Sequence, residues 1–138
     1  MKKVAFDACA ILAWLWGERG AVLVSELLRE VAEGRAWGAV CSINLGEVYY
    51  RTCREKGPTN ADSDLQMLRK LPWQVVPASD DLVWAAARLK AQYPISYADA
   101  FALACAQHHD AVLVTNDPEL VSVEHGTPVL WGTDEAAD

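Results

Sequence analysis

The stretch Val4 to Trp16 reads V-A-F-D-A-C-A-I-L-A-W-L-W and decides how the rest of the chain is interpreted. Twelve of its residues are apolar, and the remaining one is Asp7. An ionised carboxylate in so apolar a run loses its hydration unless the fold supplies a cation or hydrogen-bond donors. Residues 4–6 predict a short buried strand, and residues 8–16 predict a helix that leaves its end. Asp7 is therefore expected at the carboxyl edge of a strand, where open α/β sheets bind their ligands.

Asp7 also admits a simpler interpretation, because Asp is a common residue at helix starts. There its side chain accepts a hydrogen bond from a free backbone amide of the first turn. Both interpretations fit this stretch taken alone, so the choice between them depends on the other acids of the chain.

The composition is that of one globular domain. The chain has 138 residues, of which 52% are hydrophobic and 22% charged, so we expect a single domain over residues 1–138 with a buried core. Its net charge of −7 argues against broad phosphate neutralisation of duplex nucleic acid. A nuclease remains possible, because an acidic cluster can bind a metal ion that itself brings positive charge to a phosphate.

Cysteine and histidine spacing indicates no zinc or disulfide framework. No C-x-x-C or H-x-x-x-H pattern occurs, which makes transition-metal ligation by nitrogen and sulfur an unfavoured interpretation. The N-terminal apolar run is interrupted by Asp7, has no signal-peptide cleavage site and is too short to span a bilayer. We therefore expect a cytoplasmic protein without a membrane segment, with free buried thiols at four positions: Cys9, Cys41, Cys53 and Cys105.

Strand and helix patterns alternate along the whole chain, which predicts a parallel sheet with helices on both faces. Apolar spacing predicts strands over 4–6, 37–41, 73–76, 111–115 and 129–131, before a polar tail. It predicts helices over 8–16, from about 23 to 34, and over 97–109. Three further helices are predicted between these: one capped by Ser42 or Asn44 and ended by Gly57, one from Thr59 to the residue before Pro72, and one capped by Ser79 or Asp80. Residues 116–118, Asn-Asp-Pro, predict a turn.

Three further acids share the placement of Asp7. Glu47 falls in the first turns of the third predicted helix, and Asp99 falls in the first turn of the sixth. Asp117 directly follows the strand predicted over 111–115. All four acids thus lie near strand ends or helix starts, where one edge of the sheet would collect them.

Each of these acids has a simpler explanation as well. Asp99 follows Ser96 in a capping-box pattern, and Glu47 could form an ordinary ion pair with Arg51 four residues later. Asp117 precedes a proline and could be only a turn residue. Their joint occurrence around Asp7 is harder to explain in this way, because clustered carboxylates repel one another unless cations hold them together.

A hard divalent cation is the partner that such a cluster predicts. Mg²⁺ prefers carboxylate oxygens and retains several waters, so it needs few protein ligands and leaves room for phosphate oxygens. A bound ion of this kind activates water at neutral pH and neutralises charge that develops on phosphorus. The sequence offers no Ser or Cys with a recognisable His base, and no phosphate-binding glycine loop.

Four segments resemble the acidic motifs of PIN-domain ribonucleases, in order and at the right separations. They read V-A-F-D-A-C-A-I-L, N-L-G-E-V, S-Y-A-D-A-F-A-L-A and V-T-N-D-P-E-L, and the likeness extends from Val4 to about Trp131. The small single-domain form resembles the VapC toxins of toxin-antitoxin pairs. The resemblance implies that four residues bind metal and that the Thr115 hydroxyl orients them: Asp7, Glu47, Asp99 and Asp117. Cys9 departs from the Ser or Thr that many members have there, which puts a hydrogen-bonding role at that position in doubt.

The resemblance also implies a three-layer fold whose parallel five-stranded sheet has the order 3-2-1-4-5, with Asp7 beside Asp117. The implied activity is that of an endoribonuclease dependent on Mg²⁺, with Mn²⁺ as a substitute. Metal-activated water would attack an RNA phosphodiester in line and leave 5′-phosphate and 3′-hydroxyl ends. A cognate antitoxin that blocks the site and a homodimer are implied as partners.

Two other functions fit parts of this pattern. The first is a PIN-fold nuclease that acts on DNA or in RNA maturation without an antitoxin. The second is a non-catalytic PIN-like binding module, which the four acids disfavour because a scaffold has no need of mutually repelling charges. In either nuclease, the acidic composition predicts that substrate recognition depends on a few local basic residues.

The first predicted helix is apolar almost all round. A helix of this kind usually lies in the core, which would bury Trp14 and Trp16. Alternatively, one face is covered by a partner protein or a second subunit, since large apolar patches mark interfaces.

Overall fold

The fold, taken from a computed structural model, is described for residues 1–131. The polar tail expected after Trp131 lies outside these residues. The elements, in chain order, are β1 (Lys2–Phe6), α1 (Ala8–Leu15), α2 (Ala21–Ala32), β2 (Ala36–Cys41), α3 (Ser42–Lys56), α4 (Pro58–Arg69), β3 (Gln74–Val76), α5 (Asp80–Gln92), α6 (Tyr97–His108), β4 (Val112–Thr115), α7 (Pro118–Ser122) and β5 (Val129–Trp131).

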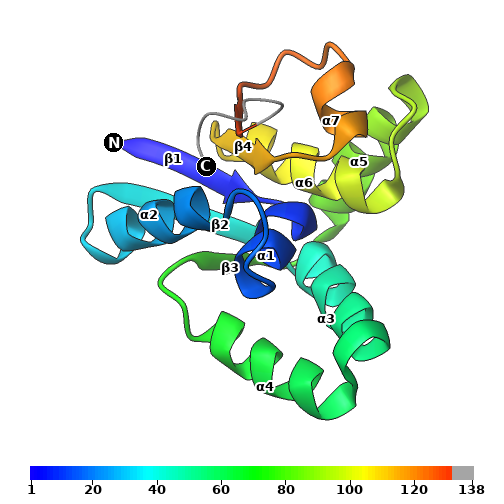
Figure 1. The fold of residues 1–138 in the computed structure, drawn as a ribbon. Helices are drawn as coiled ribbons and strands as arrows, with labels where there is room; N and C mark the ends of the chain where they lie inside the picture. Colours follow the sequence, from blue (N-terminus) through cyan, green and yellow to red (C-terminus); the bar gives the residue numbers. More distant parts are fainter. Residues whose placement is uncertain (132–138) are drawn as a thin grey trace.

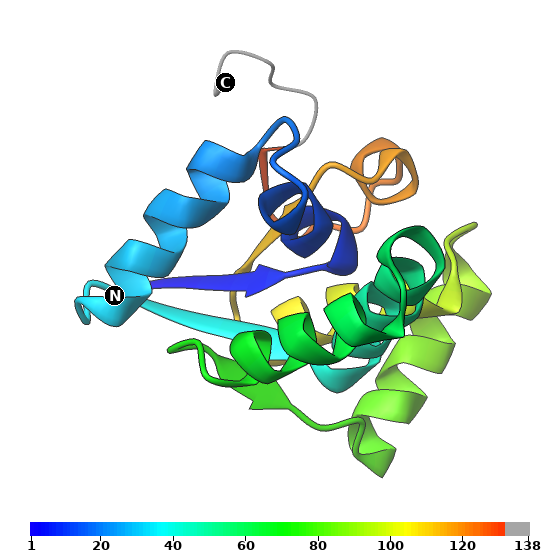
Figure 2. The same ribbon diagram turned by 60° about the horizontal axis from the view of Figure 1, so that its bottom comes forward.

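The five strands form one parallel sheet in the order β3-β2-β1-β4-β5, which confirms the predicted topology (Figure 1). Strand β1 lies at its centre, and Phe6 pairs with Val40 of β2 on one side and Val114 of β4 on the other. Figure 2 shows β1 and β2 side by side, running in the same direction. A central strand of a parallel sheet is covered on both faces, which explains why β1 reads as an unbroken apolar run.

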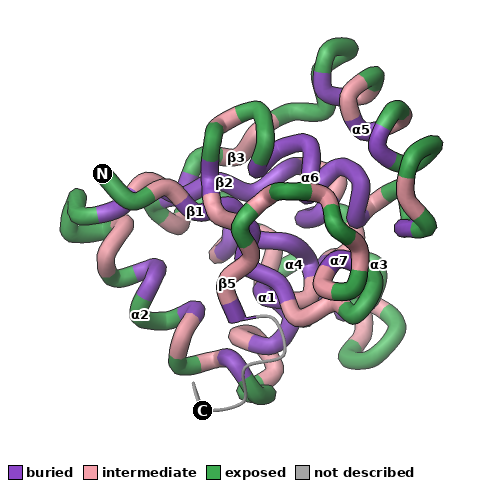
Figure 3. Tube along the Cα trace, turned by 90° about the horizontal axis from the view of Figure 1, so that it is seen from above, coloured by how far each residue is buried: buried purple, intermediate pink, exposed green. Residues whose placement is uncertain are grey.

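Successive side chains of β1 point to opposite faces of the sheet and enter two separate apolar clusters. Val4 and Phe6 pack in the cluster that contains residues of α1, α2, α3 and α4. Ala5 packs in the other cluster, with residues of α5 and α6. The sheet is therefore the middle of three layers, as predicted, and buried residues follow the strands and α6 (Figure 3).

The caps predicted for α3 are wrong. Its N-cap position is Cys41, which makes no side-chain cap, because the helix begins directly where β2 ends. Ser42 instead donates to the carbonyl oxygen of Val76, 3.1 Å away. Asn44 donates to the carbonyl oxygen of Ala98, also at 3.1 Å, and so joins α3 to α6. Ser79, by contrast, caps α5 as predicted.

Residues 116–118 do more than make the predicted turn. Asp117 caps a five-residue helix, α7, and accepts a hydrogen bond from the amide of Glu119 at 2.9 Å. Pro118 fits the first turn because its fixed φ and missing N–H suit that position. Leu120 is fully buried and holds the short helix against the core.

Trp14 of α1 and Trp16, which directly follows the helix, pack against the core and remain half-buried. The Trp14 indole N–H donates to Ser25 of α2 at 3.1 Å. Packing within the chain thus accounts for most of the apolar surface of α1. Among residues 1–131, no helix is long and apolar enough to cross a membrane. All four cysteines are free as expected, but Cys9 and Cys53 are only half-buried.

Candidate active site

Asp7 lies at the carboxyl end of the central strand and is almost fully buried, with 1% of its surface exposed. One carboxylate oxygen, Oδ1, accepts a hydrogen bond from the amide of Ala10 at 2.8 Å and caps α1. The other, Oδ2, accepts a hydrogen bond from the hydroxyl of Thr115. The capping interpretation of Asp7 is thus correct for Oδ1, whereas Oδ2 binds Thr115 at the end of the neighbouring strand β4.

Thr115 joins Asp7 to Asp117 across that strand edge. The Thr115 side chain is fully buried, at the end of β4 beside β1. Its hydroxyl oxygen also accepts a hydrogen bond from the backbone amide of Asp117 at 3.0 Å. A single hydroxyl therefore fixes one carboxylate directly and the backbone of the second, which is an arrangement that can orient both.

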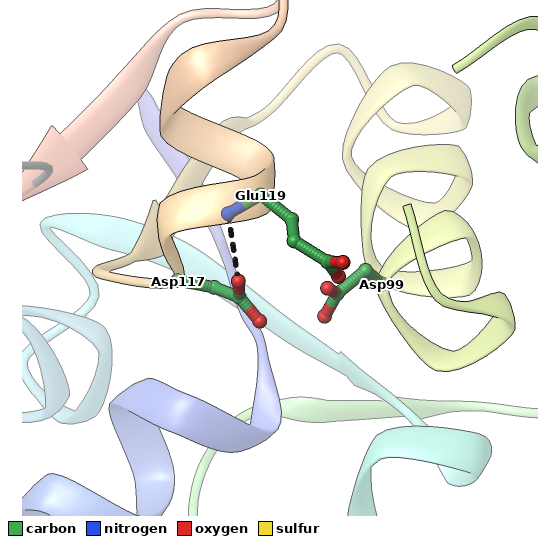
Figure 4. Close-up of side chains that lie close together, drawn as sticks. All are labelled: Asp99, Asp117 and Glu119. Carbon is green, nitrogen blue, oxygen red and sulfur yellow. Dashed lines mark hydrogen bonds between the residues drawn. The ribbon is translucent and has the colours of Figure 1, made fainter. Parts of the chain in front are cut away.

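Asp99, Asp117 and Glu119 form a compact carboxylate group, called here the acidic trio. One oxygen of each lies within 4.8 Å of the others (Figure 4). Asp99 comes from the first turn of α6, whereas Asp117 and Glu119 come from the start of α7. Asp99 is buried, Asp117 is half-buried and Glu119 is exposed, so the trio opens towards solvent.

The capping box predicted at the start of α6 is completed by a different residue. Ser96 accepts a hydrogen bond from the amide of Asp99 at 3.1 Å, as the pattern predicts. The backbone amide of Ser96, however, donates to the carboxylate of Glu119 at 3.3 Å. Glu119 thus makes the reciprocal bond that the sequence pattern assigns to Asp99.

Glu47 lies apart from the trio, in α3. Its carboxylate is 3.8 Å from Nη1 of Arg51, so the predicted ion pair is present. Burial raises the pKa of Glu47, Arg51 opposes this shift and Asp117 adds to it. Glu47 therefore belongs to the same electrostatic environment as the other acids, although the trio does not include it.

Burial dominates the protonation of the two deepest acids. It raises the pKa of Asp7 to about 7, against the hydrogen bonds from Thr115 and Ala10. Burial, together with the carboxyls of Asp117 and Glu119, raises the pKa of Asp99 to about 9. Without a cation, Asp99 retains its proton at neutral pH, whereas Asp7 titrates in this range. Burial and Asp7 likewise raise the pKa of Cys9 to about 12, which keeps this neighbour a neutral thiol.

The donor set fits a hard divalent cation. Every group of the trio offers carboxylate oxygen, and the trio contains no nitrogen or sulfur donor. Mg²⁺ and Mn²⁺ prefer such ligands, and a divalent charge offsets the burial and the repulsion that otherwise hold a proton on Asp99. The electrostatics of the site thus agree with its ligand chemistry.

Two residues of this region were missed by sequence reasoning. Glu119 lies two residues after Asp117 in the segment N-D-P-E. Prediction of a helix that starts after Asp117 would have placed Glu119 in the first turn of that helix, beside Asp117. Asn44 is 1% exposed, and its Oδ1 is a buried acceptor without a hydrogen-bond partner among residues 1–131. Only the packing of α3 against α6 reveals its role in holding Ala98.

The family model of the PIN domain matches residues 4–126. This chain belongs to the PIN domain family. No curated protein sequence matches it significantly.

Solved structures share the fold at low identity. A toxin-antitoxin complex from Klebsiella pneumoniae is 20% identical, with a TM-score of 0.66, and the match covers 94% of this chain and 98% of that one. VapBC2 from Rickettsia felis, bound to a promoter DNA fragment, is 17% identical, with a TM-score of 0.71 over 93% and 97%. VapC20 from Mycobacterium tuberculosis, a sarcin-ricin loop cleaving toxin, is 16% identical, with a TM-score of 0.66 over 91% and 99%.

Proposed function

We propose that this protein is a metal-dependent endoribonuclease and the toxin of a type II toxin-antitoxin pair. The observation that carries the nuclease proposal is the convergence of buried acids at one sheet edge, with Asp7 tied through Thr115 to the backbone of Asp117. Such acids destabilise the fold unless they serve a bound cation. Membership of the PIN domain family supports the same activity.

The structural neighbours support the toxin proposal. Two of them are toxin-antitoxin complexes, and a third is a toxin that cleaves the sarcin-ricin loop. We extend their assembly to this chain as a cognate antitoxin that covers the acidic edge, and we include a homodimer and a cytoplasmic location in the proposal. The alternative is a PIN nuclease that acts on DNA or in RNA maturation without an antitoxin.

Each residue has a distinct part in the proposed mechanism. Asp7, Asp99 and Asp117 would hold Mg²⁺ or Mn²⁺, with Glu47 and Glu119 at the margin of the same site. When bound, such an ion activates water and neutralises charge on the scissile phosphate. Thr115 holds Asp7 in one orientation, and Glu119 anchors the start of α6, which carries Asp99. Asp99 and Asp7 must lose their protons before they can serve as ligands, so metal binding strengthens as the pH rises.

Cleavage of defined single-stranded RNAs, with and without Mg²⁺, tests the proposal directly. We expect cleavage that a chelator abolishes, with 5′-phosphate ends on the products. Asp99→Asn should remove most of this activity and leave the fold intact, because an amide keeps the shape but not the charge. Asp110→Asn is the matched control. Asp110 is exposed and lies just before β4, so it lies at the amino ends of the strands, away from the acidic site. Its φ of +54° is one that Asn tolerates. Failure of the wild type to cleave RNA or DNA with any divalent ion would favour the non-catalytic binding module.

A further inference from the structure

Helix α3 carries two arginines in line with the acidic edge. Glu47, Arg51 and Arg54 lie at positions i, i+4 and i+7, which place them along one face of a helix. The helix begins where β2 ends, at the carboxyl edge, and extends away from it (Figure 1). Arg51 contacts Glu47 at 3.8 Å, and Arg54 lies about one turn further out. The positive charge therefore starts at the border of the acidic site and continues outward.

An aromatic ring completes this face. Tyr50 is 47% exposed, although large aromatic side chains are usually covered. The Arg54 guanidinium carbon lies 4.9 Å from the centre of the Tyr50 ring. The pair forms a cationic and aromatic surface on the outer side of α3. We call Tyr50, Arg51 and Arg54 together the α3 strip.

The charge balance of the protein gives this strip its significance. The whole chain carries −7, and the acidic edge adds a local concentration of carboxylates, so a polyanion is repelled from most of the surface. Arg51 counteracts this locally, because its guanidinium lies 3.8 Å from the Glu47 carboxylate at the border of the acidic site.

We propose that the α3 strip binds the single-stranded RNA substrate beside the acidic edge, with Arg51 and Arg54 on phosphates and Tyr50 stacked on one base. This inference rests on the proposed nuclease function and names its substrate contacts. Arginine suits phosphate because its planar fork donates two parallel hydrogen bonds. An exposed ring stacks on an unpaired base, which only a single strand or a loop presents.

RNA binding measured apart from cleavage tests the strip. In an Asp99→Asn background, the affinity for a labelled single-stranded RNA is measured by fluorescence anisotropy over a range of salt concentrations. Arg51→Ala and Arg54→Ala should each weaken binding and make the slope of log K against log [salt] shallower by about 0.7, the value for one lost phosphate contact. Tyr50→Ala should weaken binding about fivefold or more, and Tyr50→Phe should retain it, because stacking needs only the ring. Melting curves verify that the exposed substitutions leave the fold intact.

Arg29→Ala is the control for loss of one positive charge. Arg29 is exposed in the last turn of α2, which leads to the amino end of β2 at the opposite edge of the sheet. The control should retain the affinity and the salt slope of the parent. An equal loss in Arg29→Ala, or equal binding of a blunt RNA duplex, would overturn the proposal.

Cleavage kinetics in the active protein separate this inference from the proposed function. The strip variants should raise KM and leave kcat nearly unchanged, because they act on binding outside the reacting group. If the wild type cleaves RNA and the strip variants keep its KM and affinity, the strip proposal fails and the nuclease proposal stands. If the wild type does not cleave RNA but binds it through the strip, the nuclease proposal fails alone. Absence of RNA binding by the Asp99→Asn parent, together with absence of RNA cleavage by the wild type, overturns both.

Discussion

The backbone amide of Ser96, at the start of α6, donates a hydrogen bond to the carboxylate of Glu119, at the start of α7. Two helix starts that lie 23 residues apart in sequence are joined by this bond. Because Glu119 satisfies the amide, the carboxyl of Asp99 is left to face Asp117 at the acidic edge. The relationship gives Glu119 two separable properties, its charge and its hydrogen bond.

Substitution of Glu119 separates these properties. Glu119→Gln removes the charge but keeps an acceptor for Ser96, whereas Glu119→Ala removes both. In chelator, we expect Glu119→Gln to melt at or above the wild-type temperature, because one repelling charge is gone. We expect Glu119→Ala to be less stable than Glu119→Gln by about 1 kcal/mol, the usual net contribution of one hydrogen bond. Equal melting temperatures for the two variants would show that the bond to Ser96 contributes nothing.

Thr115→Val removes the hydroxyl that joins Asp7 to the amide of Asp117. The buried carboxylate of Asp7 and the partly buried amide of Asp117 lose a partner while the side-chain shape is retained, so we expect a loss of about 1–3 kcal/mol in the free energy of unfolding. The affinity for Mn²⁺ should fall by roughly 10-fold or more, since Asp7 is no longer oriented. Urea unfolding and metal titration measure the two effects. Thr115→Ser keeps the hydroxyl and should retain most of both, and a Ser variant as weak as Val would point to packing instead.

The metal-free protein should become less stable as the pH rises through neutrality. The folded-state pKa of Asp7 is raised to about 7 and that of Asp99 to about 9, both from an ordinary value of 3.8. At pH values between the ordinary pKa and these raised pKa values, the folded state holds more protons than the unfolded state. The free energy of unfolding therefore decreases as the pH rises through this range. Melting temperatures in chelator should therefore fall from about pH 4 to pH 9. Asp7→Asn should flatten the lower part of this range, and an unchanged profile in that variant would contradict the assignment.

A divalent cation should stabilise the folded protein. At a hundredfold excess over the dissociation constant, Mg²⁺ or Mn²⁺ adds roughly 2.7 kcal/mol, or about 9 °C in melting temperature for a domain near this size. Chelator should reverse the shift, Asp7→Asn should shrink it strongly and Asp110→Asn should leave it unchanged. A wild-type protein without any shift at millimolar Mg²⁺ and Mn²⁺ would argue against the metal site.

Glu47→Gln tests whether Glu47 belongs to the working site. The family pattern predicts that it removes most RNA cleavage, because an amide loses the charge that holds the metal. The observed ion pair with Arg51 at 3.8 Å predicts instead only a small loss of stability, within about 0.5 kcal/mol. Cleavage rates at saturating RNA decide the matter, and near-normal cleavage would exclude Glu47 from the site.

The position of Asp7 could be predicted because it follows from a local signal. An apolar run that fills a central parallel strand and ends in one acid leaves few alternatives, and Phe6 indeed lies between Val40 and Val114. The PIN resemblance supplied the strand order, which residues 4–16 alone do not specify.

The roles of Glu119 and Asn44 could not be predicted, because their partners come from distant segments. Glu119 bonds to Ser96, 23 residues away, and Asn44 bonds to Ala98, 54 residues away. Local capping rules assigned Asn44 to a helix start and Asp99 to its own capping box. In the fold, acceptors from neighbouring helices compete with those local partners and replace them.

Asp7 has both carboxylate oxygens already engaged, Oδ1 by Ala10 and Oδ2 by Thr115. Each oxygen retains a second lone pair, but rotation about the side chain would break two buried hydrogen bonds at once. A carboxylate fixed in this way cannot follow a larger ion outward or change between one-oxygen and two-oxygen coordination. In the proposed metal site, we expect such a carboxylate to favour Mg²⁺, which demands short, regular distances, over Ca²⁺, which tolerates longer and more irregular ones.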